Sequence, residues 1–255
     1  MSIDRTYLQN QRILRLYSDF LYENVNTHTD YQRDTAYIKY LSKYNFTSCF
    51  VYDDLYRNVS NLCRIIRLFA VDNHSVIIKN PFDYNGFQLI DFCLKKYKMN
   101  CAGCSIILND ILISLGLKSK CICCLPYDPD STNTHVLVHV YNDHDNKWFV
   151  ADPALGCVPC DRNGNSMDII TLRNYLSEED EVPFFQKGRL ISNDDRCIHY
   201  AQELIDKVFM FISFFNSGLS YSFNNSQIIV PGGYNNISPL YSSSYVTNNT
   251  YILFN

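Results

Sequence analysis

The stretch NCAGCSIILNDILISLGL, residues 100–117, predicts the helix around which the fold is organised. Asn100 is of a residue type that caps helix N-termini, and Gly116 is typical of the position where a helix stops. Cys101 therefore falls in the first turn, and Cys104 lies one turn further along, on roughly the same side. We expect the N-terminus of this helix to present a thiol.

After Gly116 the pattern changes to short runs of β-branched and aromatic residues, which are typical of strands. The runs are KCICCLPYD at 120–128, HVLVHVY at 135–141 and KWFVADPA at 147–154. The five residues NDHDN at 142–146 suit a hairpin loop between the last two. The middle of the chain thus predicts a helix followed by an antiparallel sheet.

The flanking segments are less distinctive. Amphipathic or turn-and-helix patterns predict further helices at 8–25, 58–71, 81–99, 161–181 and 198–216. Strand-like pieces follow at 227–231 and 250–254, in a tail rich in Ser, Asn, Tyr and Gly. The sequence has no internal repeat and no clear interdomain linker. One α+β domain over residues 1–255 is therefore the economical interpretation.

Composition argues against several classes of protein. The hydrophobic fraction of 47% is that of an ordinary globular protein. A net charge of -4 without a dense Lys/Arg run argues against a nucleic-acid partner. No stretch approaches the ~20 apolar residues of a membrane helix, and the start resembles no secretory signal. We therefore expect a cytoplasmic protein, unless a signal has been removed.

The 11 cysteines are odd in number and show no small-scaffold spacing. Free cysteine is a common core residue, whereas a disulfide framework is typical of short secreted chains. We expect most of these thiols, including those at 121, 123 and 124, to be reduced and buried. We expect neither a cofactor nor a metal.

Thiol chemistry singles out Cys101. A thiol attacks a carbonyl as the thiolate, so its pKa must be lowered. The unpaired N–H groups and the dipole of a helix N-terminus have this effect, and Cys101 is better placed for it than Cys104. A base, and a group that orients the base, are the remaining requirements.

The predicted hairpin supplies both groups. If Tyr141 pairs with Trp148, His135 lies opposite Ala154 and Asp152 is its diagonal neighbour on the same face. Diagonal neighbours stand ~7–8 Å apart at the backbone, within reach of a His–carboxylate contact. A slip of one residue would turn Asp152 to the other face.

At these residues the chain resembles the transglutaminase-like superfamily. The family pattern is a Cys at a helix start, a small residue four later and a Gly closing the helix. A His then opens an aliphatic strand that ends in Tyr or a similar residue, and a Trp and an Asp-Pro follow. Here those positions are Cys101, Ser105, Gly116, His135, Tyr141, Trp148, Asp152 and Pro153. The stretch from Asn100 to about Leu176 is also similar to a bacterial subgroup, through NCAGCS, CCLPYDP and DRNGN.

The resemblance implies an α+β, papain-like core in which the nucleophile helix packs on an antiparallel sheet. It implies Cys101 as nucleophile, His135 rather than His139 as base, and Asp152 as orienter. Cys104, His139 and Trp148 would lie nearby. The implied regions are a mainly helical part at 1–90, a catalytic core at 91–176, and a C-terminal helix with strands at 177–255.

The implied reaction passes through a thioacyl intermediate formed from a peptide or protein amide. Relatives without calcium sites are often hydrolases, so hydrolysis is favoured over transamidation. The chain departs from the pattern at Ala102, where the subgroup often has Arg. The backbone N–H of Cys101 can contribute to an oxyanion hole, but the second donor is not evident from the sequence.

Three alternatives stay open. The pairs CAGC at 101–104 and CVPC at 157–160 could hold zinc, although their separation far exceeds the usual ~15–20 residues. CAGC at a helix start also looks like a thioredoxin-type redox pair. The third alternative is a non-catalytic binding module that has kept the fold.

Overall fold

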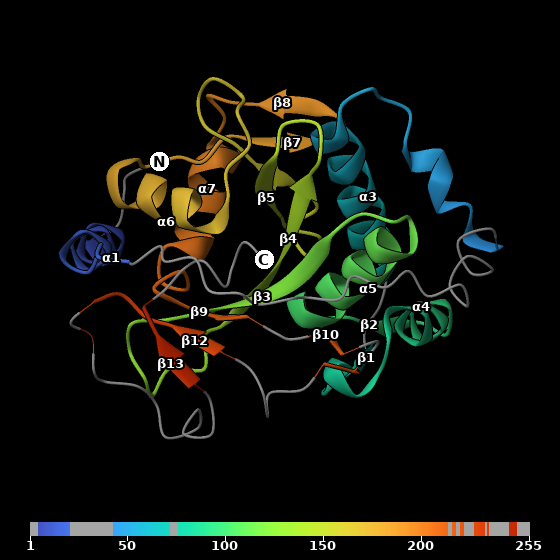
Figure 1. The fold of residues 1–255 in the computed structure, drawn as a ribbon, viewed down its shortest axis with the longest axis horizontal. Helices are drawn as coiled ribbons and strands as arrows, with labels where there is room; N and C mark the ends of the chain where they lie inside the picture. The colour runs from blue at the N-terminus through green and yellow to red at the C-terminus, as the bar shows by residue number, and fades with distance from the viewer. Residues whose placement is uncertain are drawn as a thin grey trace.

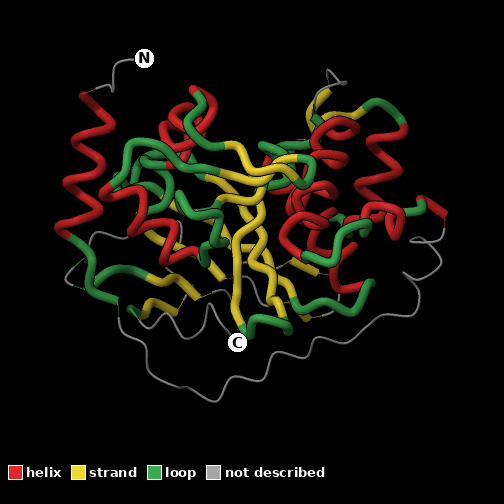
Figure 2. The backbone as a smooth tube through the Cα atoms, turned by 90° about the horizontal axis from the view of Figure 1, so that it is seen from above, coloured by secondary structure: helices red, strands yellow, loops and turns green. Residues whose placement is uncertain are grey.

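The computed structural model describes residues 5–20, 43–71, 76–213, 216–217, 220–221, 227–232, 234 and 245–248. This part of the chain is a mixed α+β structure (Figure 1). Seen from above, helices lie on both sides of a central group of strands (Figure 2).

The main sheet has the strand order β13-β12-β9-β3-β4-β5. Adjacent strands in this sheet are antiparallel, except that β12 and β13 run parallel to each other. Its strands are β3 (Ser119–Leu125), β4 (His135–Asn142), β5 (Lys147–Ala151), β9 (Met210–Ser213), β12 (Gln227–Ile229) and β13 (Tyr245–Thr247).

Smaller sheets accompany it. A three-stranded antiparallel sheet contains β6 (Val158–Pro159), β7 (Phe184–Gln186) and β8 (Arg189–Ile191). Two-stranded sheets pair β1 (Val76–Ile77) with β2 (Tyr97–Lys98), and β10 (Asn216–Ser217) with β11 (Ser220–Tyr221).

Two groups of helices flank the main sheet (Figure 1). On one side, α5 (Cys101–Ser114) packs against β3 and β4 and contacts α3 (Leu55–Ala70) and α4 (Gly86–Leu94). On the other side, α6 (Ile169–Glu178) packs against α1 (Arg5–Leu16). The remaining elements are α7 (Asp195–Leu204) and the 3-10 turns η1 (Phe46–Cys49) and η2 (Pro81–Asp83).

Helix α5 is buried around nearly its whole circumference. Asn100 caps it, because its side chain accepts a hydrogen bond from the Gly103 N–H at 3.0 Å. One turn after Cys101, the buried Ser105 hydroxyl donates to the Val136 carbonyl at 2.8 Å. This bond fixes the first turn of α5 beside the first residues of β4.

Most of the predicted elements are confirmed. Helix α5 and strands β3, β4 and β5 fall where the central stretch places them, and α3, α4 and α6 form in their predicted segments. The predicted α+β fold class, with a helix packed on an antiparallel sheet, is likewise confirmed. Helix α1 ends at Leu16, short of the predicted 8–25, and residues 21–25 and 250–254 lie outside the described residues.

The helix predicted at 198–216 is wrong over its second half. Helix α7 ends at Leu204, and β9 follows at Met210–Ser213 as an inner strand of the main sheet. Phe209, Phe211 and Ile212 are all buried. An inner strand covered on both faces needs a continuous apolar run, and periodicity alone does not separate such a run from a buried helix.

Gly86 provides a test of how tightly α4 packs on α5. A Cβ atom there would lie 3.0 Å from the Asp110 Cβ, the Ile106 carbonyl oxygen and the Ile107 Cα. We expect Gly86→Ala to lower the free energy of unfolding by about 1–3 kcal/mol, because overpacking a well-filled contact is destabilising. The measurement is the urea midpoint at unchanged m-value.

The matched control is Leu94→Ala in the same helix, where the side chain is 62% exposed. Its effect should stay within about 0.5 kcal/mol. Equal unfolding midpoints for the two variants would show that the α4–α5 contact tolerates the added methyl group.

Candidate active site

Cys101 is the first residue of α5. The first N–H groups of a helix have no intrahelical acceptor, and their partial positive charge favours an anion at this end. The backbone of Asn100 is extended, and its side-chain oxygen accepts a hydrogen bond from the Gly103 N–H. The sulfur of Cys101 is thus attached to the end of a helix that stabilises a thiolate.

His135 opens β4, and Asp152 directly follows β5. The two side chains are in contact: the His135 Nε2 lies 2.9 Å from the Asp152 Oδ2. Both are buried, Asp152 completely. Because Nε2 is engaged by the carboxylate, Nδ1 is the ring nitrogen left to interact with Cys101.

The strand register explains this contact. Tyr141 pairs with Trp148, as predicted, and the ladder continues to Val138 opposite Ala151. The prediction that His135 lies opposite Ala154 is wrong, because the ladder ends at Ala151 and the chain turns at Asp152.

That turn holds the carboxylate in place. The Asp152 backbone forms a bridge with Cys157, and its Oδ1 accepts a hydrogen bond from the Leu155 N–H at 2.9 Å. Asp152 therefore belongs to a closed turn that aims its second oxygen at His135.

Tyr200 is a residue of the site that the sequence did not indicate. Its buried hydroxyl donates to the Asp152 Oδ2 at 3.4 Å, the same oxygen that His135 contacts. Tyr200 lies on α7, far along the chain, and it has no spacing relation to the central motif. No local sequence signal could have identified it.

Electrostatics links Cys101 to His135. Burial acts to raise the pKa of the Cys101 thiol, but interaction with the His135 side chain outweighs it and lowers this pKa below its usual value. Burial acts to lower the pKa of His135, but Asp152, together with Cys101, raises it to about 10. The two shifts favour a thiolate beside an imidazolium.

Exposure also distinguishes Cys101. All 11 cysteines lie in the described ranges as free thiols; ten are buried and Cys101 is partly exposed. Cys104, one turn further into α5, is completely buried, and burial raises its pKa well above the usual value. Cys101 is therefore the thiol that a reagent in solution can reach.

His139 and Trp148 lie together, each four residues along the chain from its counterpart in the His135–Asp152 contact. Their rings stack with centroids 5.0 Å apart and planes 25° apart, and His139 is completely buried. On the neighbouring strand, Lys120 is paired with His139 and holds its ammonium group 5.1 Å from the Trp148 ring centre. Burial lowers the pKa of Lys120 to about 7. Lys120 is another buried ionisable group that the sequence analysis did not single out.

Within the described ranges, no group of three or more His, Cys, Asp and Glu side chains is arranged to hold a metal ion. The same residues include no helix with the length and apolar character needed to cross a membrane.

Comparisons with known proteins do not assign the chain to a family. No protein-family model and no curated protein matches the chain. A solved structure described as a putative cysteine protease from Cytophaga hutchinsonii is similar at 12% sequence identity and a TM-score of 0.35. The match covers 76% of this chain and 55% of that chain, so this chain spans little more than half of the solved protein.

The lowered pKa predicts selective alkylation. At about pH 6 most ordinary thiols, with a pKa of ~8.5, are protonated, so iodoacetamide should label Cys101 before the ten buried cysteines. His135→Ala should slow this labelling, because losing the interaction with His135 leaves burial to raise the pKa of the thiol and so lowers the thiolate fraction. Peptide mass mapping over time gives the rates.

The pH dependence has a definite sign. Cys101 loses its thiolate only as the pH falls through its own lowered pKa, so its labelling should persist to lower pH than that of an unfolded control. Labelling at one common rate for all cysteines, or at a rate that ignores His135, would contradict the assignment of an activated thiol.

Proposed function

We propose that this protein is a cysteine-dependent acyl-transfer enzyme that acts on peptide or protein amide bonds. Cys101 would be the nucleophile, His135 the general base and Asp152 the group that orients the base. The observation that carries the proposal is the 2.9 Å contact between His135 and Asp152, adjacent to the partly exposed thiol with a lowered pKa.

In the proposed first step, the Cys101 thiolate attacks the carbonyl carbon of the amide. The carbonyl π electrons move to oxygen, and the N–H groups at the start of α5 are suited to stabilise the oxyanion. As the tetrahedral intermediate collapses, the C–N bond breaks and protonated His135 gives its proton to the leaving amine. The products of this step are the free amine and a thioester on Cys101.

In the second step, His135 takes a proton from the acceptor, which attacks the thioester carbonyl. Water as acceptor releases a carboxylic acid, and an amine as acceptor gives a new amide. In both cases the C–S bond breaks and the Cys101 thiolate is restored. Asp152 stabilises the imidazolium in both steps and keeps its ring in one orientation.

The resemblance to the transglutaminase-like superfamily supports the same assignment and favours water as the acceptor. We therefore propose hydrolysis of peptide or amide bonds as the main reaction, with transamidation as the alternative outcome. In this scheme Cys104 acts only through packing beneath Cys101.

The test compares the two cysteines of α5. Cys101→Ser should remove nearly all hydrolysis of a mixed peptide-amide library, whereas Cys104→Ser should keep most of it. A peptidyl chloromethyl ketone should add to Cys101 alone, as read by intact mass and peptide mapping. Both variants should be checked for unchanged unfolding midpoints.

Two results would overturn the proposal. Activity that follows Cys104 rather than Cys101 would move the nucleophile and break the family resemblance. A Cys101 thiol that reacts with the ketone while no peptide amide is cleaved or transferred would favour the binding-module alternative.

A further inference from the structure

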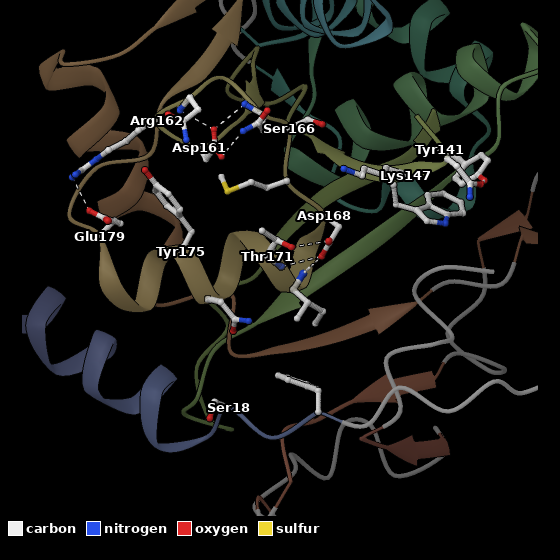
Figure 3. Close-up of a pocket in the computed structure, with 18 residues that line it drawn as sticks. Ser18, Tyr141, Lys147, Asp161, Arg162, Ser166, Asp168, Thr171, Tyr175 and Glu179 are labelled. Carbon is white, nitrogen blue, oxygen red and sulfur yellow. Dashed lines mark hydrogen bonds and ion pairs between the residues drawn. The ribbon is translucent and has the colours of Figure 1, made fainter. Parts of the chain in front are cut away.

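A pocket of about 1190 Å³ lies between the loop 161–168, α6 and the β4–β5 hairpin (Figure 3). Arg162 and Glu179, which line it, form an ion pair with each other at 2.6 Å. Its described lining residues include no cysteine, and neither His135 nor Asp152 is among them. A solute held in this pocket would not touch the thiols, so Cys101 is reached by a route outside it.

The first turn of α5 carries two thiols, and the proposed acyl transfer uses only that of Cys101. Cys104 follows three residues later and is completely buried, whereas Cys101 is partly exposed. Residues three apart on a helix are neighbours, with Cβ atoms roughly 5–6 Å apart. Helical side chains also lean toward the helix N-terminus, so the side chain of Cys104 leans toward the turn that carries Cys101. The two thiols are therefore adjacent, one at the surface and one beneath it.

These two thiols differ in reactivity. Burial raises the pKa of the Cys104 thiol well above its usual value, and the neighbouring thiols of Cys93 and Cys101 raise it further. Cys101, in contrast, has a lowered pKa. Peroxides react with thiolates rather than with thiols, so a peroxide would oxidise Cys101 and leave Cys104 as a protonated thiol. The effect of one thiol on the pKa of the other also indicates that the two sulfurs lie within electrostatic reach.

Gly103 lies between the two cysteines and gives their turn room to adjust. A disulfide needs Cβ atoms about 3.5–4.5 Å apart, which is roughly 1 Å closer than neighbours on a regular helical turn. Gly103 has no Cβ atom, so its backbone changes conformation at low cost. The N–H groups of Gly103 and Cys104 both bond to Asn100, at 3.0 Å each, which anchors the turn at its start. A disulfide can thus form through a change confined to residues 100–104.

We propose that Cys101 is a site of reversible oxidation by hydrogen peroxide and that Cys104 is the thiol that resolves it as a disulfide. Thiolate character, exposure to solvent and an adjacent second cysteine are the marks of an oxidant-sensing thiol, and Cys101 has all three. The inference goes beyond the proposed acyl transfer. The oxidation itself does not depend on that function, and only its consequence for activity does.

The oxidation proceeds in two steps. The Cys101 thiolate attacks one oxygen of hydrogen peroxide, so that the S–O bond forms, the O–O bond breaks and hydroxide leaves; the sulfur is thereby oxidised to a sulfenic acid. The Cys104 sulfur then attacks the Cys101 sulfur, so that the S–S bond forms and the S–O bond breaks. The departing hydroxide takes the Cys104 proton and leaves as water. The disulfide keeps Cys101 from the irreversible sulfinic acid stage.

The helix N-terminus and His135 make this disulfide easy to reverse. Both stabilise the Cys101 thiolate, and a disulfide whose reduced form is stabilised is readily reduced. While the disulfide lasts, Cys101 has no free thiolate to attack a carbonyl. Oxidation would therefore stop the proposed acyl transfer without destroying the thiol.

One tryptic peptide reports the reaction, since Met99–Lys118 contains Cys101 and Cys104 and no other cysteine. The intact reduced protein is treated with hydrogen peroxide at neutral pH, the remaining thiols are blocked with iodoacetamide, and the peptide is mapped by mass. It should become two hydrogen atoms lighter and carry no label. Dithiothreitol added before the blocking step should restore the labelling of both cysteines.

Cys104→Ser removes the resolving thiol. In this variant Cys101 should accumulate first as a sulfenic acid, trapped with dimedone, and then as a sulfinic acid that dithiothreitol does not reverse. The recovery of labelled Cys101 should thus fall from nearly complete in the native protein to nearly none.

The matched control is Cys123→Ser, which replaces another buried thiol that interacts with Cys101, on strand β3. It should keep both the disulfide within the 99–118 peptide and the full recovery by dithiothreitol. Unfolding midpoints check that both variants are folded. The position of the disulfide in the native protein provides a test that needs no variant.

A disulfide that joins Cys101 to another peptide, such as the one that contains Cys123, would overturn the assignment of Cys104. So would sulfinic acid formation at Cys101 at one rate in the native protein and in Cys104→Ser, or a Cys101 that stays fully labelled at peroxide concentrations that oxidise free cysteine. No substrate enters this experiment. A failure of the proposed acyl transfer, seen as a lack of amide cleavage, is therefore detected separately.

Discussion

The hydrogen bond from the Ser105 hydroxyl to the Val136 carbonyl ties the two halves of the candidate site together. Ser105 lies one turn after Cys101, and Val136 follows His135 directly. Because both ends of the bond are buried, no water replaces it, and breaking it would leave a polar group unsatisfied in the core. The distance between thiol and imidazole therefore depends on how this helix sits on this sheet, rather than on a flexible loop.

The site residues that are close in sequence could be predicted, because local rules govern them. The cap at Asn100 fixes where α5 begins, and the Tyr141–Trp148 register follows from hairpin length and strand alternation. The first rule places Cys101 in the first turn of α5, and the second brings the end of β5 beside β4. The closed turn at Asp152 was not predictable, because it depends on backbone bonds to Leu155 and Cys157 rather than on the ladder.

Contacts across long sequence separations lie beyond such rules. Tyr200 reaches Asp152 from α7, and nothing in the spacing of either residue signals the contact. The strand at Met210–Ser213 was predicted as helix because its apolar run is continuous, which reflects burial on both faces of an inner strand. The pocket beside α6 could likewise not be predicted from the sequence, since its lining comes from segments that only the tertiary fold brings together.

The position of β9 between β3 and β12 has a consequence for biosynthesis. The pairing of β3 with β9 joins residues far apart in the chain, such as Ile122 and Ser213. The pairing of β3 with β4 needs only the loop between these two consecutive strands to close. As the chain leaves the ribosome, α5 and the β3–β4–β5 meander can assemble early, with one edge of β3 unpaired. Non-local pairing is slow, and an open edge invites association with other chains. During synthesis there is thus an interval in which α5 already carries Cys101 beside β4 while the edge of β3 is still unpaired. Chaperones would be most needed in this interval.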